Sequence, residues 1–280
     1  MDNEQLKCWG QAAANLTGML KECIGVVVEP AKIKRIHKVE MEIKEDNLNQ
    51  ACKLEEMNIR ERARLRALET ELRRQANLED IGARTLDILP ETATPEYIDV
   101  NWIDTFASCA EDVGEDELKN LWANILCNES QSPGKYSKRT LNSLKNFEVK
   151  DCKMCEDIAP YVFEILEKTE YFCGILWDEE IKKRIPYRMI SHLESIGILV
   201  KSDFGVTYST YSGENIILKY QNYTNKLVNN TDSDIDIGEL IGLTETGKQI
   251  ISIINGFHDD EYKNKIINLF KDRGFTEIDE

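Results

Sequence analysis

A stretch of 45 residues without glycine or proline, from Ala31 to Gln75, constrains the fold of this 280-residue chain more than any other feature. It is rich in Glu, Lys, Arg, Leu and Ala, which all favour helices. At about 1.5 Å per residue, an unbroken helix of this length would reach about 65 Å. Leu65, Leu68 and Leu72 follow the three-four spacing of a helix face, whereas the earlier turns sustain no heptad. We expect one long helix, or a helical hairpin broken near EDNLNQ.

A modestly apolar segment, residues 4–28, precedes this stretch and ends at Pro30. It could lie in a membrane interface, with the basic sequence KIKRIHK against anionic headgroups. Lys21 and Glu22 interrupt the apolar run, which favours an ordinary packed helix. Both interpretations, a membrane or oligomer segment and a packed helix, concern the same residues: Trp9, Leu16, Leu20, Val26, Val27 and Val28.

Apolar residues recur at helical spacing between residues 77 and 170 and predict a bundle of helices. One helix stops at Pro90, and the next starts after Pro95. The helix after Gly114 has an apolar residue at every position expected of a buried face. The members of that face are Leu118, Leu121, Trp122, Ile125 and Leu126.

A Pro-Gly turn in the sequence ESQSPGKYS, residues 129–137, follows that helix. Ser137 is well placed to cap the next helix. Three cations gather at this helix N-terminus, where a phosphate or carboxylate can bind. The alternative is a solvated corner in which Tyr136 packs on Trp122 and the cations pair with nearby acidic side chains. We therefore treat as a candidate interaction or structural corner Trp102, Trp122, Glu129, Lys135, Tyr136, Ser137 and Arg139.

The sequence changes in character after Tyr171. Residues 185–222 predict a helix, a short strand ending in GILV and a hairpin that turns near YSGEN. A further strand, a cap at Thr244 and a final helix follow. Winged-helix domains have this order of elements. The second helix of such a domain would carry Arg188 as its firm cation, beside Glu194, whereas a DNA-binding helix concentrates several cations. We expect this module to contact protein.

Charge is distributed unevenly along a chain whose formal net charge is −16. The chain has 35 Lys+Arg and 51 Asp+Glu. Residues 31–78 hold 12 of the basic and 9 of the acidic residues, a net charge of +3. The rest of the chain holds 23 basic and 42 acidic residues, a net charge of −19. The chain as a whole should repel nucleic acid and anionic membranes. Eight cysteines without a signal peptide favour free thiols in a reducing cytoplasm. No run approaches the roughly 20 apolar residues of a membrane-spanning helix.

Motifs that carry chemistry are weak in this sequence. Cys152 and Cys155 have metal-ligand spacing, but a tetrahedral zinc site needs two further ligands nearby. Asp104, Glu117 and Lys119 resemble a metal-dependent nuclease pattern, yet Glu117 and Lys119 open a helix and not the strand that this chemistry needs. No nucleophile elbow, Walker loop or dinucleotide-binding glycine pattern occurs. We expect no catalytic residue, metal or cofactor.

A family resemblance runs through the central residues, over roughly residues 77–255. The matching residues are Asn77-Leu78-Glu79-x-Ile81, Ile98-Asp99-x-x-Trp102-Ile103-x-x-Phe106, and Leu121-Trp122-Ala123-x-Ile125-Leu126-x-x-Glu129-x-x-x-Pro133-Gly134-x-x-Ser137-x-Arg139-Thr140-Leu141. This pattern resembles the bacterial family of domain of unknown function 2806. It is also similar to abortive-infection alpha-type proteins. The resemblance implies an accessory role in phage defence or stress and supplies no catalytic residues.

Together these features predict a mainly α protein with three segments. Residues 1–76 form a long N-terminal helical arm, residues 77–170 a helical bundle, and residues 171–280 a winged-helix-like α+β module. The expected function is that of a cytoplasmic, non-enzymatic interaction or regulatory protein with a protein partner or a homo-oligomeric state. Two alternatives stay open: a membrane-acting abortive-infection effector that uses residues 1–38, and a DNA-binding regulator that uses the tail.

Overall fold

The computed structural model describes residues 3–28, 57–90, 93, 96–166, 171–201, 207–208, 213, 215–231, 235–236, 238–254 and 258–278. The chain divides into a first compact unit, Met1–Val149, and a second, Lys150–Glu280. The division precedes the boundary near residue 170 that the sequence indicated. The expected hairpin near EDNLNQ and the basic sequence KIKRIHK lie outside the described residues.

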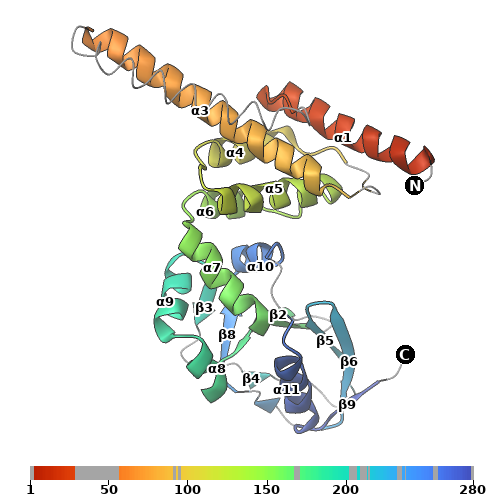
Figure 1. Ribbon diagram of the computed structural model, residues 1–280. Helices are drawn as coiled ribbons and strands as arrows, with labels where there is room; N and C mark the ends of the chain where they lie inside the picture. Colours follow the sequence, from red (N-terminus) through yellow and green to blue (C-terminus); the bar gives the residue numbers. More distant parts are fainter. Residues whose placement is uncertain are drawn as a thin grey trace. The chain divides into compact units, whose positions relative to one another are not determined.

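The long helix α3 (Ile59–Ile88) is the central element of the first unit (Figure 1). A capping box fixes its start. The side chain of Asn58 accepts hydrogen bonds from the backbone amides of Arg60 and Glu61, and the carboxylate of Glu61 accepts one from the backbone amide of Asn58. The helix runs through residue 77, where the sequence indicated a separate helix. Its buried residues begin at Ala76 and form one face of the second half, whereas no residue from Ile59 to Gln75 is buried.

Charged side chains hold the second half of α3 against α5 (Asp116–Gln131). The ammonium of Lys119 is buried and lies 3.0 Å from the carboxylate of Asp80. The guanidinium of Arg84 bridges Asp80, at 3.1 Å, to Asp116 and Asn120 on α5. Burial alone would raise the pKa of Asp80, but the hydrogen bonds from Arg84 and Lys119 outweigh burial and lower it.

The N-terminal helix α1 (Asn3–Ile24) packs on α3 and on α4 (Val100–Ala110). It ends at Gly25, whose φ of 67° suits the left-handed C-cap position, and the Gly25 amide donates to Lys21 O. The chain then passes Gly82 of α3 so closely that a Cβ there would lie 2.7 Å from Val28 Cγ2. Gly82 therefore lets the N-terminal valines enter the core.

The helices α4, α5 and α6 (Lys138–Leu144) complete the first unit. The side chain of Asp99 caps α4, and Ser137 caps α6 by accepting the amide of Thr140 at 3.2 Å, as the sequence predicted. The predicted apolar face of α5 is confirmed, because all of its members are buried: Leu118, Leu121, Trp122, Ile125 and Leu126.

The second unit is built on a seven-stranded antiparallel sheet in the order β3-β8-β2-β1-β5-β6-β9. Its strands are β1 (Phe163–Leu166), β2 (Tyr171–Leu176), β3 (Leu199–Lys201), β5 (Asn215–Tyr220), β6 (Tyr223–Asn229), β8 (Leu240–Leu243) and β9 (Phe275–Glu277). The short strands β4 (Thr207–Tyr208) and β7 (Ile235–Asp236) pair separately.

Helices connect and cover the strands of this sheet in the described part of the second unit. The helix α9 packs beside β3, α10 beside β8, and α11 beside β9. Tyr262 of α11 contacts the ring of Tyr220, so α11 covers the face that carries Leu218 and Tyr220. The elements are α7 (Val149–Ile158), the turn Ala159–Tyr161, α8 (Glu179–Arg184), α9 (Tyr187–Ser195), α10 (Glu245–Ile251) and α11 (Asp260–Lys271).

The prediction of a mainly α chain with a small winged-helix-like tail is wrong: the fold class is α+β. The helix pattern ends at the 3₁₀ turn around Pro160, and β1 and β2 follow where we expected more helix. The predicted position of the main hairpin is also wrong. The hairpin joins β5 to β6 through Gln221, whose φ is 50°, whereas the last residue of YSGEN, Asn215, is the first residue of β5. The Thr244 cap of α10 is confirmed.

The buried ion pairs of Asp80 make the first unit sensitive to acid. A carboxyl with a lowered folded pKa contributes stability that is present above its unfolded pKa, about 3.9, and is lost as pH falls further. We expect Asp80→Asn to lower the free energy of unfolding at pH 7 by about 3 kcal/mol, since Lys119 stays buried without its counter-charge. Between pH 6 and pH 3 this variant should lose less stability than the parent.

Denaturant unfolding followed by circular dichroism measures both effects. The control is Asp87→Asn on the exposed side of the same helix, which should change stability by less than about 0.5 kcal/mol. An Asp80→Asn protein as stable as the parent at pH 7 would contradict the anchoring role.

Candidate functional site

The first half of α3 is an exposed amphipathic helix, and we name residues 59–75 the α3 arm. Leu68 is 58% exposed and Leu72 43% exposed, and Leu65 is partly exposed on the same side of the helix. Figure 1 shows the arm continuing beyond α4, α5 and α6. Exposed leucines at three-four spacing form an apolar stripe, which is the pattern of a helix that binds another surface.

Arginines accompany this stripe. Arg60 and Arg64 precede Leu68 and Leu72 at four-residue spacing, so all four lie along one side of the helix. Within the described part of the chain, Arg60, Arg64 and Arg66 form no ion pair. At the base of the arm Arg74 pairs with Asp112 at 2.9 Å. The outer arm therefore presents arginines that have no ion-pair partner among the described residues, beside an apolar stripe.

A groove with the opposite charge lies between α1 and α4, and we name it the α1–α4 groove. Its hollow measures about 740 Å³. Glu22, Glu96 and Asp104 are exposed along it, and none of them forms an ion pair with a described residue. The side chains of Tyr97 and Val100 are also exposed there. The groove combines carboxylates with apolar surface, which complements the arm.

The predicted corner from Trp102 to Arg139 is held together by a buried carboxylate. Glu129 is only 1% exposed, and its two oxygens accept hydrogen bonds from the amides of Gly134, at 2.6 Å, and Tyr136, at 2.9 Å. Gly134 has a φ of 88°, which suits glycine in the turn. Glu129 thus fixes the turn that joins α5 to α6.

Aromatic rings fill the space beneath this turn. The indole of Trp102 donates to the carbonyl of Tyr136 at 2.7 Å and stacks on Phe106, whose ring meets Trp122 edge-on with centroids 5.3 Å apart. Trp102, Trp122 and Tyr136 are all buried. A partner cannot touch these side chains without opening the core, so their role is structural.

The cations of the corner point outward and are partly engaged locally. The ammonium of Lys135 lies 3.2 Å from Asn128 Oδ1 and 5.5 Å from the Tyr136 ring centroid, and that of Lys138 lies 4.0 Å from Asp99. Arg139 is exposed and forms no ion pair among the described residues. The buried residues of the corner therefore form a scaffold, and its cations form a small charged surface.

The N-terminal residues singled out from the sequence lie mainly in the core. Leu16, Leu20, Val26 and Val28 are buried, and Val27 is partly exposed. Trp9 belongs to α1, but its side chain is outside the described part of the chain. No helix among the described residues has the length and apolar character needed to cross a membrane.

The other sequence motifs resolve into packing contacts. Cys152 and Cys155 are buried in α7, and burial raises the pKa of the Cys155 thiol. Lys119 points at Asp80, whereas Glu117 is exposed in the first turn of α5. His192 Nε2 lies 2.6 Å from Asp151 Oδ1 and links α9 to α7. Among the described residues, no group of three or more His, Cys, Asp and Glu side chains could hold a metal ion.

Sequence reasoning found the leucine spacing of the arm but missed the α1–α4 groove, and it missed a polar cavity in the second unit. The groove joins residues from two helices far apart in the chain, and the cavity joins several strands. No local pattern marks either of them, because the residues meet only in the folded chain.

One family model matches residues 61–267, and it describes a protein of unknown function (DUF2806). The match spans well over half of the chain, so the chain belongs to this family, as the resemblance predicted. No curated protein and no solved structure matches it. The bacterial origin and the similarity to abortive-infection proteins stay predictions.

The buried carboxylate of Glu129 gives the test of the corner. Glu129→Ala would leave the buried amide of Tyr136 without its acceptor, at about 1–3 kcal/mol, and would also remove the acceptor of the more exposed Gly134 amide, so it should lower the free energy of unfolding by about 2 kcal/mol or more. Arg139→Ala, at an exposed position, should change it by less than about 0.5 kcal/mol. Thermal and denaturant unfolding of the two variants measures this difference. Equal stability of both variants would rule out the scaffold role of Glu129.

Proposed function

We propose that this member of the DUF2806 family is a non-enzymatic interaction protein that self-associates, with the α3 arm of each copy bound in the α1–α4 groove of a second copy. The observation that carries the proposal is the exposed leucine stripe of the arm, which lies beside arginines that have no ion-pair partner among the described residues.

Apolar contact supplies the drive for this association. Leu68 and Leu72 are about half exposed, so burying the rest of each side chain contributes roughly 1 kcal/mol, about half of the value for a fully exposed leucine. The loss of translational and rotational freedom on association opposes this gain. Met19, Tyr97 and Val100 give the groove an apolar strip that Leu68 and Leu72 can cover. The arm has 17 residues and is about 25 Å long, which is enough to reach across a groove between two helices.

Charge supports a second copy as the occupant. Outside residues 31–78 the chain carries a net charge of −19, so most of the surface of another copy is acidic. Glu22, Glu96 and Asp104 place three of these carboxylates along the groove. Arginines that meet them would form ion pairs while the leucines exclude water, and the charges would set the register of the contact.

Symmetry makes the contact self-limiting. When the arm of each copy binds the groove of the other, both contacts are related by a two-fold axis, and the assembly closes as a dimer. The interface is then present twice, so a moderate contact gives a stable dimer.

The other hypotheses gain less support. A membrane-acting effector would have to withdraw Leu16, Leu20, Val26 and Val28 from the core. DNA binding by α9 would rest on Arg188, because His192 of that helix is engaged with Asp151. The setting in phage defence stays a prediction that rests on the resemblance alone.

Oligomeric state tests the proposal. Light scattering after size exclusion should show a dimer for the full chain at low salt, and the dimer should weaken as ionic strength rises. The double variant Leu68→Ser, Leu72→Ser should be monomeric, because the apolar contact is lost. The matched control is Ala63→Ser, Ala67→Ser, at exposed positions of the same arm outside the stripe, and it should stay dimeric.

Charge exchange distinguishes the arm–groove contact from any other dimer. The double variant Arg60→Glu, Arg64→Glu reverses the charge at these two positions of the arm. The double variant Glu22→Lys, Glu96→Lys reverses the charge at these two positions of the groove. Each variant alone should be monomeric, since like charges then meet, whereas an equimolar mixture should form a mixed dimer. A monomeric parent at all salt concentrations, or a dimer that survives both charge reversals, would overturn the proposal.

A further inference from the structure

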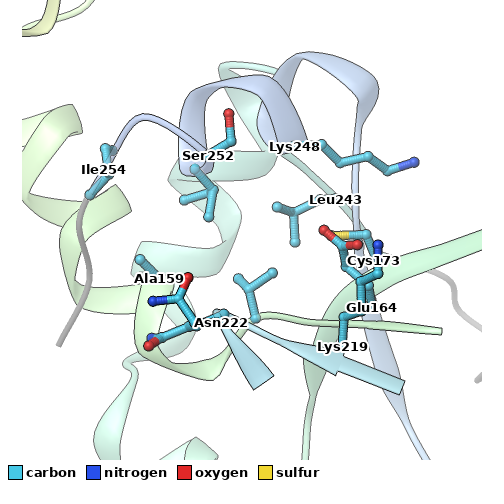
Figure 2. A pocket seen from close by; sticks show the side chains of 12 residues that line it. Ala159, Glu164, Cys173, Lys219, Asn222, Leu243, Lys248, Ser252 and Ile254 are labelled. Carbon is cyan, nitrogen blue, oxygen red and sulfur yellow. The ribbon is translucent and has the colours of Figure 1, made fainter. Parts of the chain in front are cut away.

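A polar cavity in the second unit lies between the central strands of the sheet and α10. Its volume is about 470 Å³, which is within the range of small-molecule sites. Figure 2 shows Lys248 and Ser252 on one side of it and Glu164, Cys173 and Lys219 on the sheet opposite. Asn222, in the turn between β5 and β6, lies at its border.

Three residues of the cavity form a row across adjacent strands. Cys173 on β2 is directly opposite Glu164 on β1, and Glu164 is directly opposite Lys219 on β5. Residues that are paired in this way share one face of an antiparallel sheet. The topology of the sheet therefore brings an acid and a thiol from neighbouring strands together with a lysine from β5, which follows Glu164 by 219−164 = 55 residues.

Two lysines give the cavity its positive charge. Lys219 is half-buried, yet it forms no ion pair with any described residue, although Glu164 is its cross-strand partner. The ammonium of Lys248 lies 4.1 Å from the centroid of the Tyr171 ring and 3.4 Å from Glu245. Since the ammonium of Lys248 already faces the Tyr171 ring and Glu245, Lys219 is the group that would gain most from a bound anion.

Glu164 provides the complementary chemistry. Its carboxylate lines the cavity and accepts hydrogen bonds only, so it favours a ligand that carries a hydroxyl or amino group. Ser252 and the amide of Asn222 can serve as additional polar partners. Positive charge at Lys219 and an acceptor at Glu164 together require a ligand with two different polar groups.

The thiol in the row does not point to covalent catalysis. Cys173 is buried, and burial raises the pKa of Cys173 to about 12. It is a neutral thiol at physiological pH and hence a poor nucleophile. The cavity has the features of a binding site.

We propose that this cavity binds a small molecule that carries a phosphate or carboxylate group and a hydroxyl or amino group, with Lys219 and Lys248 on the anion and Glu164 on the donor. The inference does not depend on the α3 arm, because the cavity lies wholly within the second unit.

Calorimetric titration of the full chain tests this site with three probes: glycerol 3-phosphate, inorganic phosphate and glycerol. The proposal predicts that glycerol 3-phosphate binds more tightly than phosphate and that glycerol, which has no anion, does not bind. Lys219→Met should weaken the binding of glycerol 3-phosphate at least about tenfold. Glu164→Gln should reduce the preference for glycerol 3-phosphate over phosphate.

The control is Lys183→Met, which removes an exposed lysine of α8 that does not line the cavity and should leave the affinity unchanged. Thermal unfolding of each variant shows whether it is folded. If Lys219→Met does not fold, Lys248→Met serves as the second lysine variant. Failure of both anions to bind at about 10 mM, or binding that neither lysine variant weakens, would overturn the proposal.

Discussion

The buried contact between Asp80 and Lys119 fixes the element on which the first unit depends. Together with Arg84 it fastens the second half of α3 to α5, and α1 then packs against the same helix beside Gly82. Only the second half of α3 is used in this way. Because that half is clamped, the first half can remain exposed without loss of the fold, and its leucines and arginines are available for another surface.

A similar division of roles occurs at the turn between α5 and α6. Glu129 and the aromatic residues beneath it are buried and hold the two helices together, so this part of the family pattern concerns the scaffold. In the second unit the sheet is the scaffold, and its strand pairing gathers Cys173, Glu164 and Lys219 into one row. Each unit thus supports one candidate binding surface on a rigid framework.

Local periodicity allowed much of the first unit to be predicted. The apolar face of α5, the Ser137 cap and the leucine spacing of α3 are all visible within a few turns of sequence. The sheet was largely missed for a physical reason: four successive residues of β2, from Cys173, are buried, so the strand shows no alternation of polar and apolar residues. The groove and the cavity were missed because their residues become neighbours only through long-range packing.

Hydrogen exchange of the full chain, measured by mass spectrometry at low and high protein concentration, tests the central claim most directly. Two segments should gain protection as the concentration rises: residues 59–75 of the arm and the groove residues of α1 and α4. Residues 216–220 of β5 in the second unit should exchange equally at both concentrations. Exchange of the arm that does not depend on concentration would contradict the account.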